Sequence, residues 1–250
     1  MTDTTTAPTR HRQGGPPLPI PVLAYGALMI TSVALLASAP QPAAPPATVL
    51  AYDQAHHRAL EVAGCLGFAA ALPLAIWVAA AYRRLRTNLG VVAPGAVIGL
   101  VGGLLAAASL ALTGLINWTS SQLHGLGDPT LARALTDLSF ATGSAGFVAP
   151  LGILIAGIAV PALFLGFLPR PLAWAGLAVA ALSALSTFTL LTSALEATLP
   201  IGRFVGLAWL IATSILLPTS RPVAEVGYLV NHRSRLTGRR NSERTSSRGE

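Results

Sequence analysis

The segment DQAHHRALE, residues 53–61, places two acids, two histidines and an arginine in nine positions of a chain with only 10% charged residues. Asp53, His57 and Glu61 follow one another at intervals of four, so in a continuous helix they would share one face. Imidazole and carboxylate groups are ordinary metal ligands. The spacing therefore indicates that His57 and Glu61 could ligate one metal ion.

A third ligand for this metal would come from His124 or Asp128 in a later loop. The competing interpretation is a polar rim, in which Asp53 caps a helix N-terminus and His57 pairs with Glu61. The sequence favours the rim, because it lacks an HExxH pair and adjacent histidines point about 100° apart on a helix. It predicts no catalytic and no cofactor-binding residue, and it leaves three metal candidates: His57, Glu61 and His124.

The rest of the chain is apolar enough to decide the fold class. Of 250 residues, 53% are hydrophobic and only 10% are charged, whereas a soluble domain carries roughly 25% charged residues. The apolar residues form six blocks of about bilayer-spanning length. We therefore predict an all-α polytopic membrane protein with six transmembrane helices in a bundle, at residues 21–39, 59–82, 92–116, 146–168, 172–192 and 201–217.

The arginines predict the orientation of the bundle. The chain has sixteen arginines and no lysine, and thirteen of them lie in the two tails or in the 83–86 and 170 connections. Only Arg58, Arg133 and Arg203 fall on the opposite side. Basic residues near span ends are retained in the cytoplasm. We therefore expect a multi-pass protein of a bacterial inner membrane, with both termini cytoplasmic and residues 53–61 outside.

The composition divides the chain into three parts. Residues 1–19 are expected to form a disordered cytoplasmic tail, residues 20–217 the six-helix domain, and residues 218–250 a disordered basic cytoplasmic tail. The basic tail should lie against anionic lipid. Nucleic acid is disfavoured as its partner, because Tyr228 is the only aromatic residue among its arginines. The single Cys65 excludes an internal disulfide and a four-thiolate metal site.

The N-terminal block has an alternative interpretation. Two arginines, an apolar block and the small residues 37–39 resemble a cleaved secretory signal, which would leave five spans and an outside N-terminus. The block of about 19 residues exceeds the usual signal core of roughly 7–15, and Pro40 would directly follow the cut. These two features favour an uncleaved first span.

Two outside segments have predicted structures of their own. The Pro-rich stretch at residues 41–50 should be extended. Residues 129–141 should form a short amphipathic helix on the outer surface, with an ion pair between Arg133 and Asp137. This helix should break near residues 143–146 before the fourth span begins.

Small residues and buried polar groups predict how the helices associate. Gly95, Gly99 and Gly103 form one stripe that should contact another helix, either in the same chain or in a homo-oligomer. Thr113 and Asn117 are available for hydrogen bonds between helices. An outer network of three charged residues is also predicted: Glu61, Arg203 and Glu196.

Several segments carry a family resemblance, above all the turn at residues 167–174 (FLPRPLAW) and the motif at residues 199–204 (LPIGRF). They resemble uncharacterised actinobacterial-type integral membrane proteins that are filed as a domain of unknown function. The resemblance covers about residues 15–220. It implies a six-helix membrane domain and assigns no activity.

The leading functional hypothesis is a non-enzymatic membrane component that needs no cofactor and associates with the lipid bilayer and with a membrane partner or further copies of itself. The alternative is a small-solute or lipid-handling transporter whose site lies near the outer halves of the second, third and sixth helices. A third hypothesis is a membrane enzyme that uses the outward-facing His/Glu rim.

Overall fold

The computed structural model describes residues 17–41, 44–88, 94–125 and 127–218. The chain divides into two units, Met1–Leu217 and Pro218–Glu250. The predicted tails lie outside the described residues, except for residues 17–19 and 218. Every regular element of the described residues is a helix, so the all-α fold class is confirmed.

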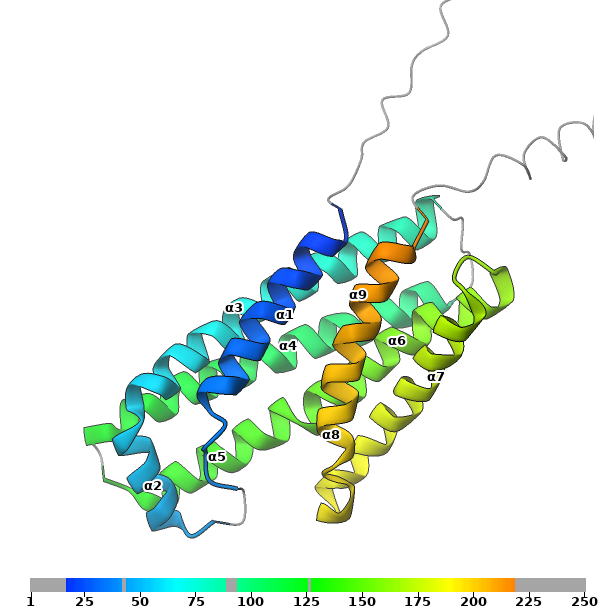
Figure 1. The fold of residues 1–250 in the computed structure, drawn as a ribbon. Coiled ribbons are helices and arrows are strands. Elements are labelled where there is room, and N and C mark those ends of the chain that lie inside the picture. The colour runs from blue at the N-terminus through cyan, green and yellow to red at the C-terminus, as the bar shows by residue number, and fades with distance from the viewer. Residues whose placement is uncertain (1–16, 42–43, 89–93, 126, 219–250) are drawn as a thin grey trace, which may run out of the picture. The chain divides into compact units, whose positions relative to one another are not determined.

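Five helical runs are long and apolar enough to cross a membrane, and they are joined by one shorter apolar helix, α1 (Pro19–Leu35) (Figure 1). The runs at residues 57–86 and 170–190 end in a short π and a short 3-10 segment, respectively. The third run consists of α5 and α6 together. The helices of these five runs are α3 (His57–Arg83), α4 (Gly95–Ser121), α5 (Pro129–Gly143) with α6 (Ala145–Leu165), α7 (Arg170–Leu185), and α8 (Thr198–Pro200) with α9 (Gly206–Leu216).

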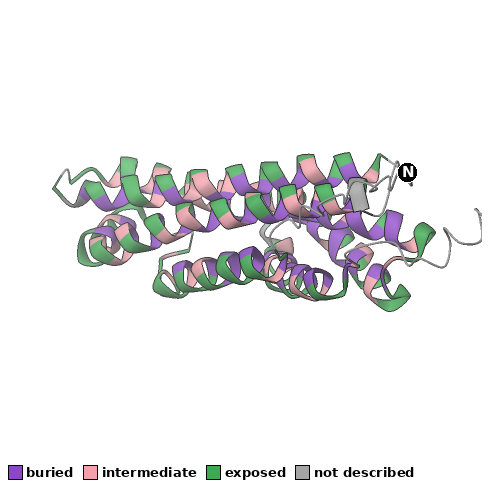
Figure 2. Cartoon of the chain, turned by 90° about the horizontal axis from the view of Figure 1, so that it is seen from above, coloured by how far each residue is buried: buried purple, intermediate pink, exposed green. Residues whose placement is uncertain are grey.

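The outward faces of these helices are apolar. Leu72, Ile76, Trp174 and Ile215 each expose more than half of their surface. In Figure 2, buried residues line the inner faces of the long helices, and exposed residues alternate with them on the outside. Water would not solvate such a surface, whereas hydrocarbon would. The structure is therefore that of a membrane-embedded bundle.

Glycine contacts hold α4 against α6 inside the chain. A Cβ atom on Gly95 would lie 2.7 Å from Pro161 Cγ and 3.0 Å from the Gly157 carbonyl oxygen. Gly99 faces the same turn of α6, since a Cβ atom on it would lie 3.5 Å from Gly157 Cα. The predicted glycine stripe is thus a helix contact, and its partner is a neighbouring helix of the same chain. Gly103 lies between two helices, because a Cβ atom there would be 2.5 Å from Val78 of α3 and 3.2 Å from Leu154 of α6.

The first and last helices, α1 and α9, lie side by side near the end of the bundle where α3 ends (Figure 1). Leu207 of α9 fits against Gly26 of α1, where a Cβ atom would be 3.1 Å from its side chain. Arg84, in the π-helical turn η1 (Arg84–Asn88), donates to the Leu217 carbonyl oxygen at 3.3 Å. The beginning of α1 and the end of α9 therefore lie at the same end of the bundle.

The opposite end carries α2 (Pro46–Ala55), α5 and the 3-10 turn η2 (Gln122–Gly125). A small apolar cluster of Val49, Leu123 and Ala132 joins them. The predicted extended conformation is wrong for residues 46–50. Proline at the first helical position costs no hydrogen bond and already has a helical φ, so Pro46 begins a helix.

The helix α5 forms where the sequence predicted one. Asp128 caps it by accepting hydrogen bonds from the Thr130 and Leu131 amides, at 2.9 and 3.3 Å. The predicted pair between Arg133 and Asp137 is confirmed at 2.8 Å. A second Arg133 nitrogen donates to the Ala44 carbonyl oxygen, which fastens α5 to the segment before α2.

The helical run from α5 to α6 is interrupted at Ser144, within the predicted break. Ser144 has a non-helical φ of −91° and ψ of −99°, and its hydroxyl donates to the Phe140 carbonyl oxygen. Glycine before the break lowers helix propensity, which makes an interruption less costly here. The interruption brings backbone polar groups and a serine side chain into the interior of the bundle.

Candidate functional site

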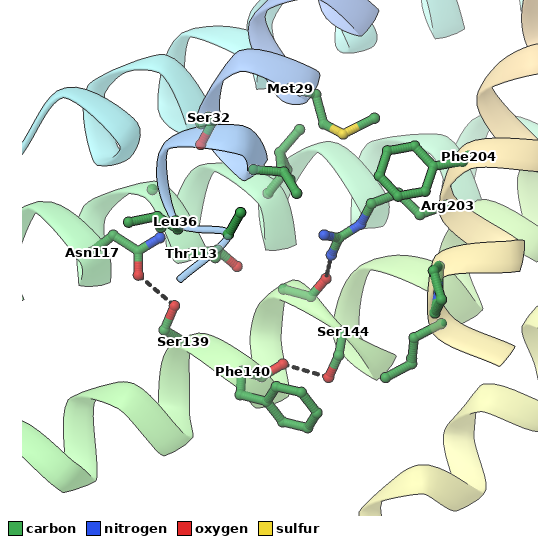
Figure 3. Close-up of a pocket in the computed structure, with 18 of the residues that line it drawn as sticks. Met29, Ser32, Leu36, Thr113, Asn117, Ser139, Phe140, Ser144, Arg203 and Phe204 are labelled. Carbon is green, nitrogen blue, oxygen red and sulfur yellow. Dashed lines mark hydrogen bonds between the residues drawn. The ribbon is translucent and has the colours of Figure 1, made fainter. Parts of the chain in front are cut away.

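A cavity of about 460 Å³ lies beside this interruption. Its walls come from the end of α1, the second half of α4, the α5–α6 junction and the α8–η5 segment, where η5 is the π-helical turn Ile201–Val205 (Figure 3). Ligand pockets commonly measure about 300–1,000 Å³. The volume is therefore sufficient for a small organic molecule or for part of a lipid.

Arg203 is the charged group at the centre of this pocket. Its side chain extends from η5 toward the α5–α6 junction, where one Nη donates to the Gly143 carbonyl oxygen (Figure 3). The guanidinium carbon also lies 5.5 Å from the centre of the Phe147 ring, a cation–π contact. Among the described residues, no carboxylate lies within 4.0 Å of this guanidinium.

These contacts only partly satisfy Arg203. A guanidinium has five N–H donors, and the Gly143 carbonyl is one of the last carbonyls of α5, which a cation stabilises. A structural role as a helix cap therefore accounts for part of the side chain. An uncompensated positive charge in a membrane bundle is costly and usually marks a functional site. The remaining donors can bind an anion that enters the pocket.

The start of α6 also lies at the pocket wall. Its first residue, Ala145, follows the pocket-lining Ser144 directly. A helix N-terminus carries a partial positive charge and unpaired amide groups. Interrupted helices in transporters use such ends to hold anionic substrates. The C-terminus of α5, which has the opposite partial charge, meets the α6 N-terminus at Ser144, so Arg203 is the main positive group of the pocket.

A polar wall on α4 and α5 faces Arg203 across the pocket. Ser139 donates to Asn117 Oδ1 at 2.5 Å (Figure 3). Thr113 donates to Thr142 at 2.9 Å. The prediction that Thr113 and Asn117 join helices is confirmed. Arg203 is the one basic side chain among the residues that line the pocket, so it is the group best suited to meet an anion.

The remaining lining is largely apolar, and one acid lies at its edge. Met29, Leu36, Leu110 and Phe204 supply hydrocarbon surface. Glu196 lines the pocket and is exposed. The pocket therefore combines a positive centre, an apolar lining and a carboxylate at its mouth.

The segment that first suggested chemistry does not form one helical face. The chain leaves the helix at His56, with φ −119° and ψ 23°, so Asp53 belongs to α2 while His57 and Glu61 belong to α3. The prediction of a shared face is wrong for Asp53. Asp53 does not cap α3 either, because His56 is the N-cap and makes no side-chain cap bond.

Asp53 is instead buried in α2. Its side chain is only 4% exposed, and its Oδ2 atom has no hydrogen-bond partner among the described residues. Burial disfavours the charged form and raises the pKa of this carboxyl to about 6. Sequence spacing could not reveal this, because the burial comes from packing between distant segments.

The metal candidates stay predictions. Glu61 lies 3.4 Å from Arg58, in an exposed ion pair at the start of α3. The backbone of His124 belongs to η2, but its side chain lies outside the described residues. Over the described part of the chain, no group of three or more His, Cys, Asp or Glu side chains could hold a metal.

The predicted network of Glu61, Arg203 and Glu196 is not formed by direct ion pairs. Arg203 and Glu196 line the same pocket, whereas Glu61 does not line it. Two of the three predicted network residues therefore belong to the pocket, but the predicted contact between them is wrong. It gave no signal for the Gly143 carbonyl, which the helix interruption exposes to Arg203.

Comparisons of the chain with protein-family models, curated proteins and solved structures found no match. The class defined by the fold is a helical membrane protein with an internal pocket.

Proposed function

We propose that this chain is a non-enzymatic membrane protein that binds an anionic molecule in the pocket around Arg203, as a lipid-handling or small-solute carrier would. The observation that carries the proposal is the guanidinium of Arg203, which faces a cavity with no carboxylate within 4.0 Å among the described residues. A bound anion would supply the missing charge.

We further propose six crossings of a bacterial inner membrane, with α1 as the first and both tails in the cytoplasm. The support is the arginine distribution and the adjacent ends of α1 and α9. The resemblance to multi-spanning membrane proteins of unknown function agrees with this arrangement. In this orientation α2, α5 and the pocket mouth face the outside, and the basic C-terminal tail meets anionic lipid.

The test compares three probes with equal chains: dodecyl phosphate, dodecanoate and dodecyltrimethylammonium. Binding to the purified full-length protein in a neutral detergent is measured by titration calorimetry and by thermal stabilisation. We expect the two anions to bind and to raise the unfolding temperature, and the cation to do neither. Stronger binding of the cation would overturn the proposal.

Variants connect the binding to Arg203. Arg203→Met should abolish anion binding, and Arg203→Lys should weaken it, because lysine keeps the charge but loses the planar array of donors. Arg58→Met is the matched control, since Arg58 is exposed and lies outside the pocket. If Arg203→Met does not fold, Ala37→Trp tests the same pocket, because Ala37 is an exposed lining residue. Unchanged binding in both Arg203→Lys and Ala37→Trp would reject the site.

A further inference from the structure

The pocket contains two charged side chains of opposite sign that do not pair with each other. Arg203 is half-buried and hydrogen-bonded to the α5–α6 junction, whereas Glu196 is exposed at the mouth. The distance between their charged atoms exceeds 4.0 Å. Two separated charges of opposite sign form a fixed pattern that a ligand can match.

This pattern discriminates between kinds of anion. A ligand with only negative charge would gain from Arg203 but would be repelled by the Glu196 carboxylate on its way in and after binding. A ligand that carries both an anionic and a cationic group could satisfy both side chains. Such a ligand needs its anionic group at the deeper position and its cationic group toward the mouth.

The lining indicates that the ligand also has a hydrocarbon part. Met29, Leu36, Leu110 and Phe204 line the same pocket as the two charged residues. Phe204 is 40% exposed, and its neighbour Ile201 is 43% exposed, so the pocket borders an apolar outer surface. A chain attached to the headgroup could occupy this apolar lining.

We infer that the pocket binds a zwitterionic amphiphile, with a phosphate or carboxylate on Arg203 and an ammonium group beside Glu196. The inference rests on the proposed anion site and adds the cationic half of the ligand. A primary ammonium suits the position, because it is compact and can donate several hydrogen bonds to a carboxylate. An ethanolamine phospholipid has this chemistry together with an acyl chain.

The test uses lyso-phosphatidylethanolamine and lyso-phosphatidylglycerol with the same acyl chain. They share a phosphate and differ in the ammonium group. Each is titrated into the purified full-length protein in a neutral detergent. We expect the ethanolamine lipid to bind about five-fold more tightly, the contribution expected of one partly exposed ion pair. Equal binding, or tighter binding of the glycerol lipid, would overturn the inference.

Glu196→Gln separates this inference from the proposed function. The variant should bind both lipids with nearly equal affinity and should still lose both when combined with Arg203→Met. Glu61→Gln is the control, because it removes an acid outside the pocket and should keep the preference. If the preference survives Glu196→Gln while Arg203→Met abolishes binding, the cationic half is wrong and the anion site stands. If Arg203→Met binds both lipids normally, both proposals fail.

A final comparison identifies the source of the ligand. Free phosphoethanolamine presents the same two charges without a chain. We expect it to bind at least about tenfold more weakly than the lyso-lipid, because each buried methylene contributes about 0.8 kcal/mol. Equal binding of free phosphoethanolamine would show that the pocket takes a soluble zwitterion and would overturn the assignment to an amphiphile.

Discussion

Gly157 of α6 and Gly95 of α4 face each other so closely that a Cβ atom on Gly157 would lie 2.6 Å from the Gly95 carbonyl oxygen. Backbone atoms surround this position, and they cannot turn aside as a side chain could. Helices in lipid gain little from burying apolar surface, so close backbone packing is a main source of their association. The contact is therefore a sensitive point for the stability of the bundle.

We predict that Gly157→Ala lowers stability by about 1–3 kcal/mol, the usual cost of overpacking. Gly125→Ala is the matched control, because a Cβ atom there meets nothing within 4 Å. The measurement is the thermal unfolding midpoint of the purified protein in detergent. Equal midpoints for the two variants would show that α4 and α6 do not pack as described.

A buried hydrogen bond between α3 and α9 supports a second prediction. Trp77 Nε1 donates to Ser214 Oγ at 2.7 Å, and both side chains are buried. Trp77→Phe should cost about 0.6–1.7 kcal/mol, the size found for hydrogen bonds between membrane helices. Trp118→Phe, at a 46% exposed tryptophan, should cost less. The measurement is the free energy of unfolding of Trp77→Phe, Ser214→Ala and the double variant by chemical denaturation. If the losses of the two single variants simply add in the double variant, the two side chains do not interact.

Asp53 predicts a dependence of stability on pH. Its folded pKa of about 6 lies above the ordinary value of 3.8, so the folded state holds the proton more tightly than the unfolded chain. The resulting stabilisation is complete below about pH 4 and is lost as the pH rises through about 6. Asp53→Asn keeps the neutral form at every pH. Its stability relative to the parent should therefore increase between pH 4 and 7, by at most about 3 kcal/mol.

The measurement is the difference in unfolding midpoint between Asp53→Asn and the parent across this pH range. Asp137→Asn serves as the comparison, because Asp137 is an exposed acid in an ion pair with Arg133. A difference that stays constant from pH 4 to 7 would mean that Asp53 is not the titrating group.

The orientation of the bundle can be tested with single cysteines. Cys65 is the only cysteine of the chain, so Cys65→Ala supplies a cysteine-free parent. We expect Gln54→Cys to react with a membrane-impermeant maleimide in intact cells, and Thr87→Cys to react only after permeabilisation. Neither substitution removes an arginine. The reverse pattern would overturn the predicted cytoplasmic location of both termini.

The long helices could be predicted because each depends on a local property, a run of apolar residues about as long as a bilayer is thick. The predicted ends of these helices were less accurate than their positions along the chain. The run expected at residues 92–116 is observed as Gly95–Ser121, since its polar last turn continues the helix beyond the hydrophobic block. The helix α2 was missed because proline content suggested an extended chain, although proline also begins helices.

The pocket could be predicted only in part. Arg203, Glu196, Thr113 and Asn117 attract attention as polar residues in apolar surroundings. Their arrangement depends on contacts between distant positions, such as the bond from Arg203 to the Gly143 carbonyl, sixty residues away. Such a contact leaves no periodic pattern in the sequence. The metal hypothesis, in contrast, rested on a local pattern of residues spaced by four. The helix break at His56 divides this pattern, so Asp53 belongs to α2 and His57 and Glu61 belong to α3.

The bond between Arg203 and Gly143 fastens the last turn of α5 to the segment that enters α9. The other end of α5 is fastened to the segment before α2 by Arg133. One helix is thus held at both ends by arginines acting as tethers. An anion that draws the Arg203 guanidinium away from Gly143 would break the bond at the end of α5. Binding in the pocket would then free one end of a helix whose other end packs against α2.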